Sequence, residues 1–271
     1  MNNISLNGVI IPASEPALTA SNRSFRYGEG LFETMRVKEG SILLAAYHFD
    51  RLFSGLATLK IEIPPGFNDS KLQQEILHLC TRNECTRLAR VRLSVSREEE
   101  PGKPGSLQWL IEASPLEKTM TEWNEKGLRI DIYPLARKSC DAFANLKSTS
   151  YLPYAMAAAY AKDHQWDDCL VLNNHEAIAD SSIANVFIIK NGEIRTPAIS
   201  EGCIQGVMRR FVLEQLEILG YRVKTGRIGI NDLEEADEVF LTNAIRGIRW
   251  VRQFRDKKYS NGTTLKIYRS L

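Results

Sequence analysis

The sequence predicts an α+β (mixed α/β) fold that is divided into two domains. Segments with helical spacing of apolar residues alternate with short strand-like segments along the 271 residues, and strand-like segments are more frequent in the second half. Near the middle, from Ser114, a polar stretch without clear period separates the two halves. We therefore expect an N-terminal α+β domain at 1–116, a linker at 117–124 and a C-terminal mixed α/β domain at 125–271.

Composition restricts the classes of function. The apolar fraction is 44%, the charged fraction is 25% and the formal net charge is +2, so neither nucleic acid nor a membrane is an expected partner. The longest apolar runs have only the length of strands and the first residues lack a signal-peptide pattern, so we expect a cytoplasmic protein. The five cysteines lack C-x-x-C spacing and the four histidines lack ligand spacing, which predicts no metal site.

Turn residues and apolar periodicity predict the elements of the first half in order. Short apolar runs on both sides of Asn7-Gly8 predict a hairpin over Ile4–Ile11. The glycines at 28 and 30 permit a tight backbone before the next strand. Apolar spacing then predicts strands at Leu31–Val37 and Ile42–Ala46, and helices at 48–59 and 69–83.

Two arginines distinguish the strand that is predicted over Arg87–Val95. Alternation places Arg90 and Arg92 on one face of this strand and apolar residues on the other. Such arginines either meet solvent or line a pocket for a carboxylate, and both interpretations stay open. The next residues, Glu98–Ser106, are polar and rich in proline and glycine, which predicts a loop of the kind that often contacts a substrate. A strand returns at Leu107–Ala113.

The second half contains a helix whose start is a candidate anion site. Apolar spacing predicts this helix over Gly206–Leu219, among strands at 127–135, 168–172, 184–189 and 238–242. A glycine that opens a helix exposes backbone N–H groups at the positive end of the helix dipole, where anions bind. Gly206 as an ordinary helix start is the alternative.

One lysine is notable for its surroundings. Lys147 follows the apolar Leu146 and precedes three small polar residues, and Pro153 then fits the first turn of an alanine-rich helix. A place near a helix N-terminus and partial burial both disfavour an ammonium group. A neutral lysine is a nucleophile, and it commonly forms a Schiff base with a carbonyl group. The alternative is a surface lysine near a helix cap.

Arg51 lies beside the apolar stripe of the helix predicted at 48–59. An arginine near a buried face needs an anion, and a phosphate group would serve through a bidentate contact. The alternative is an ion pair with Asp50 or another acid.

Several ordered blocks of sequence together resemble one enzyme family. They are YGEGLFETMRV at 27–37, HFDRL at 48–52, Lys147, ADSSIANVF at 179–187, TPAISEGCIQGVMRR at 196–210 and DEVFLTNAIRGIRWV at 237–251. With these blocks the chain resembles the class IV (fold-type IV) pyridoxal-phosphate enzymes, which include aminodeoxychorismate lyase and the branched-chain and D-amino-acid aminotransferases. The blocks at 32–34, 200–210 and 242–244 look more like the lyase branch.

The resemblance implies a two-domain fold similar to that of D-amino-acid aminotransferase, with pyridoxal 5′-phosphate as cofactor and a small amino compound as substrate. It also implies a homodimer, with the active site between the domains and near the dimer contact. Lys147 would form an aldimine with the cofactor and later move the α-proton of the substrate. Thr34 and Tyr27 would border the substrate, with Thr34 in the catalytic set, and Arg92 would bind a substrate carboxylate.

The resemblance also implies which residues bind the phosphate group of the cofactor. Arg51 would bind it together with the backbone N–H groups of Val207 and Met208, and the turn that begins at Thr242-Asn243 would complete the site. These are the arginine and the helix start that the sequence alone associates with an anion.

The chain departs from the family pattern at three places. The acid that pairs with the pyridine nitrogen is a glutamate in the family, five residues before the asparagine of an N-x-F strand, and here Asp180 and Asn185 occupy these positions. Because aspartate is shorter by one methylene, either the backbone comes closer or a water intervenes. Ser150 replaces a common asparagine, and Lys103 is the only basic residue of the segment 98–106, where many relatives bind a substrate carboxylate.

The resemblance to the lyase branch favours the reaction of an aminodeoxychorismate lyase, which converts 4-amino-4-deoxychorismate to 4-aminobenzoate and pyruvate in folate biosynthesis. An amino-acid aminotransferase for branched-chain or D-amino acids is the alternative, because both reactions begin with the same two steps. A non-catalytic protein that binds the cofactor and an α+β protein without cofactor are more remote hypotheses.

Overall fold

A computed structural model describes residues 2–100 and 103–271. Its contacts divide the chain into two compact units, of which the first comprises Met1–Thr121 with Lys147–Tyr151 and the second comprises Glu122–Leu146 with Leu152–Leu271. The expected C-terminal domain contained Lys147, whereas the contacts of this lysine group it with the first unit.

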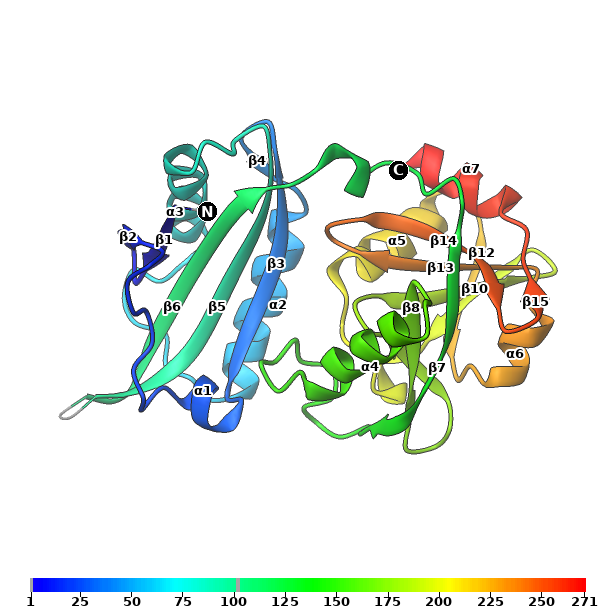
Figure 1. Ribbon diagram of the computed structural model, residues 1–271, viewed down its shortest axis with the longest axis horizontal. Coiled ribbons are helices and arrows are strands. Elements are labelled where there is room, and N and C mark those ends of the chain that lie inside the picture. Colours follow the sequence, from blue (N-terminus) through cyan, green and yellow to red (C-terminus); the bar gives the residue numbers. More distant parts are fainter. Residues whose placement is uncertain (1, 101–102) are drawn as a thin grey trace. The chain divides into compact units, whose positions relative to one another are not determined.

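The first unit is a six-stranded sheet in the order β2-β1-β6-β5-β3-β4. Helix α2 packs on β3, and α3 packs on β6 and β1 (Figure 1). The core side chains between sheet and helices include Met35, Leu93 and Leu52. The elements are β1 (Asn3–Leu6), β2 (Val9–Pro12), α1 (Arg23–Tyr27), β3 (Gly30–Lys38), β4 (Ser41–Ile42), α2 (Ala45–Thr58), α3 (Asp69–Arg82), β5 (Leu88–Glu100), β6 (Lys103–Pro115) and a 3₁₀ turn (Lys118–Met120).

The start of the first unit confirms one sequence prediction and corrects another. The hairpin is formed as predicted, with both turn residues, Asn7 and Gly8, at positive φ. The strand predicted over Ile42–Ala46 is wrong beyond Ile42, because Leu44 adopts a left-handed conformation and α2 begins at Ala45. A short apolar run fits a strand or the first turn of a helix equally well, and packing of α2 on β3 decides for the helix.

The loop predicted over Glu98–Ser106 is also wrong. Strand β5 continues to Glu100 and β6 begins at Lys103, and the two strands pair through Glu98 with Ser106 and Glu100 with Lys103. Residues 101 and 102 of the predicted loop lie outside the described residues. Backbone pairing in a long antiparallel ladder is independent of side-chain polarity, so a polar composition does not by itself end a strand.

The second unit is a nine-stranded mixed sheet in the order β12-β11-β10-β13-β14-β7-β8-β9, with β15 paired to β14. Helix α4 packs on β7 and β8, and α5 packs on β12 and β13 (Figure 1). Its elements are β7 (Leu128–Lys138), α4 (Leu152–Asp163), β8 (Asp168–Asn173), β9 (Ile178–Ser181), β10 (Asn185–Lys190), β11 (Glu193–Pro197), a 3₁₀ turn (Ile199–Glu201), α5 (Val207–Ile218), β12 (Arg222–Gly226), α6 (Ile230–Glu235), β13 (Glu238–Asn243), β14 (Gly247–Phe254), β15 (Lys257–Lys258) and α7 (Gly262–Ser270).

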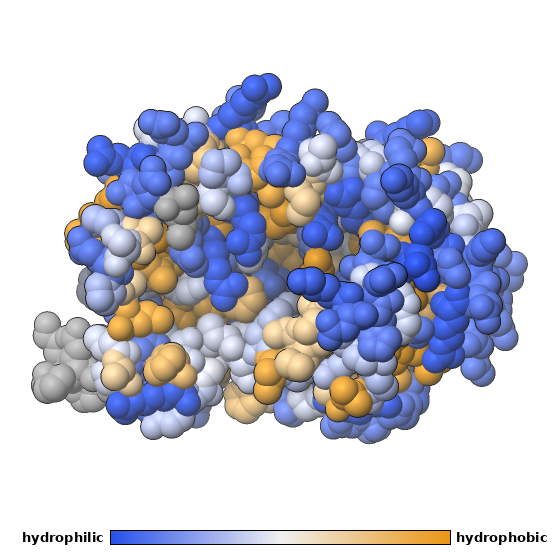
Figure 2. Space-filling view, in the orientation of Figure 1, coloured by the Kyte–Doolittle hydropathy of each residue, from blue (hydrophilic) through white to orange (hydrophobic). Residues whose placement is uncertain are grey.

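One face of the molecule is mainly hydrophilic. Figure 2 shows hydrophilic residues over most of the visible face, with apolar residues scattered among them. Within the described ranges, no helix is both long enough and apolar enough to cross a bilayer.

Candidate functional site

Lys147 lies in a short segment that pairs with β3 of the first unit. Its carbonyl oxygen accepts a hydrogen bond from the N–H of Phe32 at 2.9 Å, and the N–H of Thr149 donates to the carbonyl oxygen of Gly30 at 2.9 Å. Helix α4 begins only at Leu152. Since the dipole acts within the first turn of a helix, it contributes little at Lys147, and the sheet rather than the helix positions this lysine.

The amine of Lys147 is surrounded by aromatic rings. Its Nζ lies 4.3 Å from the ring centroid of Phe32 and 5.6 Å from that of Tyr151. The two rings meet edge to face with centroids 5.4 Å apart. Ring faces attract an ammonium group, so these contacts help to hold the amine in place.

Arg92 contacts the same phenylalanine. Its guanidinium carbon lies 3.8 Å from the ring centroid of Phe32. Burial and the charge of Arg90 lower the pKa of Arg92, while Glu112, 3.9 Å away, acts against them. An arginine remains charged under such shifts. A cation that binds carboxylates therefore lies one aromatic ring away from the Lys147 amine.

Thr34 belongs to the same face of the first sheet. It is the cross-strand partner of Arg92, and it follows Phe32 by two residues along β3, so all three side chains share one face. Tyr27 is different: it is the last residue of α1, it is 63% exposed and it is stacked on Arg23. This ring contact lies within α1, and a place for Tyr27 beside the substrate stays a prediction.

Arg51 binds an acid within its own unit. Its Nε and Nη2 donate to the two carboxylate oxygens of Glu33 at 2.7 Å and 2.6 Å, and Nδ1 of His48 lies 2.5 Å from the same carboxylate. Burial raises the pKa of Glu33, but the charges and hydrogen bonds of Arg51 and His48 outweigh burial and lower it to about 2. An acid that pairs with Arg51 is therefore Glu33 on β3.

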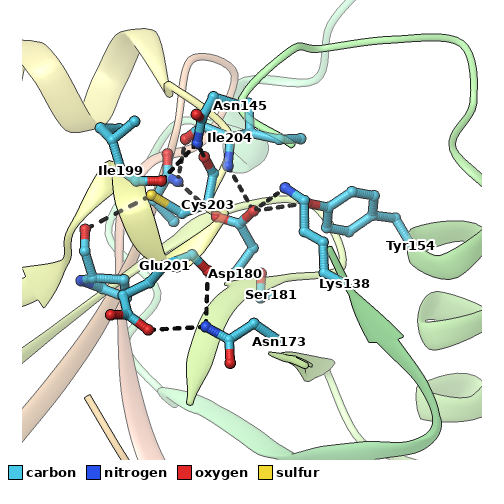
Figure 3. Close-up of polar contacts among 12 residues, drawn as sticks. Lys138, Asn145, Tyr154, Asn173, Asp180, Ser181, Ile199, Glu201, Cys203 and Ile204 are labelled. Carbon is cyan, nitrogen blue, oxygen red and sulfur yellow. Dashed lines mark hydrogen bonds and ion pairs between the residues drawn. The ribbon is translucent and has the colours of Figure 1, made fainter. Parts of the chain in front are cut away.

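Asp180 is the centre of a hydrogen-bonded cluster in the second unit (Figure 3). Three donors reach its Oδ2: the hydroxyl of Tyr154 at 2.7 Å, the N–H of Ile204 at 2.8 Å and the ammonium of Lys138 at 3.3 Å. Its Oδ1 accepts from Nδ2 of Asn185 at 2.7 Å. A carboxylate oxygen can accept two or more hydrogen bonds. Among the described residues Asn185 is the one donor to Oδ1, so this oxygen retains capacity for another.

Lys138 and Tyr154 are the site residues that sequence reasoning missed. Lys138 is the last residue of β7 and lies three residues beyond the strand predicted at 127–135, and Tyr154 is the third residue of α4. Neither position carries a local signal, because the contact to Asp180 depends on how β7, α4 and β9 come together.

Asn185 connects Asp180 to the start of α5. Its Nδ2 also donates to the carbonyl oxygen of Ile204 at 2.8 Å. A Cβ atom at Gly206 would lie 1.7 Å from Oδ1 of Asn185, so a side chain at this position would displace the asparagine. Close packing against Asn185 therefore requires a glycine at position 206. The sequence had suggested only an anion site or an ordinary helix start at this position.

The start of α5 is open to an anion. Gly206 is the N-cap and provides no side-chain hydrogen bond. In the described part of the chain, the N–H groups of Val207 and Met208 have no hydrogen-bond acceptor. These N–H groups lie at the positive end of a twelve-residue helix, an arrangement that favours a phosphate or carboxylate group.

Thr242 is a second feature that favours an anion-binding site. Its side chain is 2% exposed, and its hydroxyl has no hydrogen-bond partner among the described residues. Thr242 is the cross-strand partner of Asn185, so the two side chains share one face of the sheet. Asn243 instead stabilises the following turn, since its Oδ1 accepts from the N–H groups of Ile245 and Arg246.

Comparison with known proteins identifies the family. The family "Amino-transferase class IV" matches residues 30–254. An aminodeoxychorismate lyase of Bacillus subtilis is 30% identical over 89% of this chain and 83% of its own length. A putative branched-chain-amino-acid aminotransferase of Methanocaldococcus jannaschii is 26% identical over 99% of this chain and 93% of its own length.

A solved structure shows the same fold. The branched-chain aminotransferase of the archaeon Thermoproteus uzoniensis, solved with norvaline, is 21% identical and superimposes with a TM-score of 0.87 over 99% of this chain and 92% of that one. The chain belongs to the class IV aminotransferase family. This confirms the resemblance and the α+β fold class that the sequence predicts.

Proposed function

We propose that this protein is a pyridoxal-phosphate enzyme and that its reaction is that of an aminodeoxychorismate lyase. One observation carries the cofactor assignment: in the second unit, Asn185 joins the Asp180 carboxylate to the open N-terminus of α5. An acid that can bind a pyridine nitrogen and an anion site that can bind a phosphate group are therefore neighbours. A molecule with both groups fits this pair of features.

The second unit would hold the two ends of the cofactor. The phosphate group would accept hydrogen bonds from the N–H groups of Val207 and Met208 and from the hydroxyl of Thr242, which has no partner within the described residues. Arg51 would add a charge, although its Nε and Nη2 already bind Glu33. Oδ1 of Asp180 would take the pyridine nitrogen.

The first unit would supply the reactive amine and bind the substrate. When bound, the cofactor supplies a carbonyl carbon for amines and a ring that accepts the electron pair left on the substrate carbon. Lys147 would hold the carbonyl carbon and, once displaced by the substrate amine, would take the proton from the carbon that bears nitrogen. Arg92 would bind a substrate carboxylate, and Thr34, on the same face, would border it.

The lyase assignment is supported by the B. subtilis relative, which is a lyase, and by the lyase-like blocks at 32–34, 200–210 and 242–244. An aminotransferase is the second candidate, because the M. jannaschii relative matches almost the whole chain. The substrates of both reactions carry a carboxylate, so Arg92 fits both. The two candidates differ only after the first proton has been removed.

The purified protein tests both parts of the proposal. With added pyridoxal 5′-phosphate, we expect a visible absorption band that borohydride reduction fixes on Lys147, as located by peptide mass mapping. In Lys147→Ala the fixed label should disappear and turnover should fall by a factor of at least about 10³. Labelling and turnover at the parental level in Lys147→Ala would refute the cofactor assignment.

Two substrate assays separate the candidate reactions. Aminodeoxychorismate should yield 4-aminobenzoate and pyruvate, whereas a panel of L- and D-amino acids with a keto acid should yield no amino transfer at a comparable rate. Turnover in the amino-acid assay alone would replace the lyase by the aminotransferase.

We further propose a homodimer, as the resemblance implies. Light scattering coupled to size-exclusion chromatography should give twice the 30.7 kDa chain mass. A mass of one chain at micromolar concentration would contradict it.

A further inference from the structure

A second lysine of the chain is buried beside Asp180. The side chain of Lys138 is 10% exposed and that of Asp180 is 3% exposed. The Nζ atom lies 3.3 Å from Oδ2 and 5.1 Å from the ring centroid of Tyr154, whose hydroxyl donates to the same oxygen. Figure 3 shows Lys138 and Tyr154 both directed at the carboxylate of Asp180. The ammonium group is thus in contact with a carboxylate and an aromatic ring.

An irregularity in the sheet accompanies this arrangement. The parallel pairing of β7 with β8 runs regularly to Ile132 and Leu170 and resumes only at Arg137 and Leu172. Four residues of β7 therefore lie opposite a single residue of β8, Val171, which is the cross-strand partner of Asp180. Such bulges change the direction of side chains next to functional sites. Here the bulge precedes Lys138 by one residue.

A buried lysine costs free energy unless it is paired. The other three donors to Asp180, which are Tyr154, Ile204 and Asn185, are neutral and already satisfy the hydrogen-bonding needs of a structural carboxylate. Lys138 adds a positive charge to them. Its effect on Asp180 is therefore mainly electrostatic.

The other titratable groups around the pair do not replace this charge. Burial and the Asp180 carboxylate raise the pKa of the Cys203 thiol to about 12, and burial with Glu201 raises that of Cys140, so both thiols are neutral at pH 7. Glu201 binds Asn173. Arg209, on α5, donates to the carbonyl oxygen of Pro197.

We propose that Lys138 is a positioning residue that orients and neutralises Asp180, so that a pyridine nitrogen bound to Asp180 holds its proton less firmly than it would beside an unpaired carboxylate. This inference rests on the proposed function. The physical reason is that the carboxylate attracts the proton on the ring nitrogen, whereas the ammonium of Lys138 repels it. Lys138 thereby sets how strongly the ring withdraws electrons.

Nitrogen NMR of the bound cofactor tests this inference. The protein is loaded with pyridoxal 5′-phosphate that carries ¹⁵N in the ring, and the ring resonance is followed as a function of pH. In Lys138→Met the midpoint of protonation should rise by about one pH unit relative to the parent, because one positive charge is lost nearby. In Lys138→Arg, which keeps the charge, the midpoint should stay within a few tenths of a unit of the parent value.

The controls separate this inference from the function on which it rests. If the parent takes up no cofactor that can be reduced onto Lys147, the proposed function and the inference about Lys138 are both refuted. If the parent is loaded but Lys138→Met has the parental midpoint, or Lys138→Arg shifts as Lys138→Met does, only the role of Lys138 is refuted. Should Lys138→Met fail to fold, Lys138→Gln keeps a hydrogen-bond donor without the charge, and the same rise is expected.

Discussion

Each unit contains a buried carboxylate with a cation beside it, and the two carboxylates are bound differently. In the first unit, Arg51 donates to both oxygens of Glu33 at 2.6–2.7 Å and His48 adds a third contact. In the second unit, Lys138 reaches only Oδ2 of Asp180, at 3.3 Å, while Oδ1 has Asn185 as its donor. Both oxygens of Glu33 are thus bound by a cation, whereas Oδ1 of Asp180 has one neutral donor and can accept another hydrogen bond.

This difference indicates that the two carboxylates have different roles, one in stability and one in function. A bidentate ion pair between β3 and α2 fixes a helix on its sheet, and its acceptor capacity is used within the protein. Asp180 has three donors on Oδ2 and a single donor on Oδ1, so Oδ1 can accept a further hydrogen bond from a ligand. We therefore expect Glu33 to contribute mainly to folding and Asp180 mainly to the reaction.

The largest expected effect is on turnover in Asp180→Asn. The neutral amide cannot form an ion pair with a protonated ring nitrogen, so kcat at saturating cofactor and substrate should fall by about 10² to 10³. Asp168→Asn is a matched control, since Asp168 is buried in the same unit and its partners are serine side chains and backbone N–H groups. A kcat of Asp180→Asn within threefold of the parent value would contradict the assignment of Asp180 to the reaction.

The next effect is on stability in Glu33→Gln. Loss of one partner leaves Arg51 without its counter-charge, and the free energy of unfolding should fall by about 3 kcal/mol. Urea titration followed by circular dichroism measures it. Glu39→Gln, which removes an exposed ion pair with Arg87, should cost less than about 0.5 kcal/mol. Equal costs for the two variants would show that the Glu33 pair is not a structural clamp.

Acid should weaken the same ion pair. The pKa of Glu33 is about 2 in the folded protein and 4.5 ordinarily, so its contribution is complete above pH 4.5 and is lost as the pH falls from 4.5 toward 2. The loss amounts to about 3 kcal/mol over this range. The stability difference between the parent and Glu33→Gln, measured by urea titration at pH 7, 4 and 3, should therefore shrink at the lower pH values. A difference that stays constant down to pH 3 would contradict this assignment.

The smallest effect concerns Thr242. In Thr242→Val the affinity for pyridoxal 5′-phosphate should fall by about tenfold, because one hydrogen bond to the phosphate group is lost. The cofactor-free variant should be at least as stable as the parent, because the removed hydroxyl has no partner within the described ranges. Thr196→Val is the control: its hydroxyl binds the carbonyl oxygen of Val186, so its loss should lower stability and leave affinity unchanged. Unchanged affinity in Thr242→Val would remove Thr242 from the phosphate site.

Local patterns in the sequence determined most of the elements and several of the candidate residues. The Asn7-Gly8 hairpin, the amphipathic helices α2, α3 and α5 and the alternation in β5 follow from spacings of two to four residues, and the structure contains them. The motif blocks likewise indicated Lys147, Asp180 and the start of α5, because a motif is itself a local pattern. The family to which the chain belongs could be predicted from the sequence for the same reason.

The partners of these residues were decided by the tertiary structure. Glu33 meets Arg51 from a different element, and Lys138 and Tyr154 reach Asp180 across 42 and 26 positions of the chain. The length of the β5–β6 hairpin was likewise set by strand pairing and not by its polar composition. Spacing along a sequence specifies which face a side chain occupies, whereas strand register and the bulge in β7 determine what that face meets.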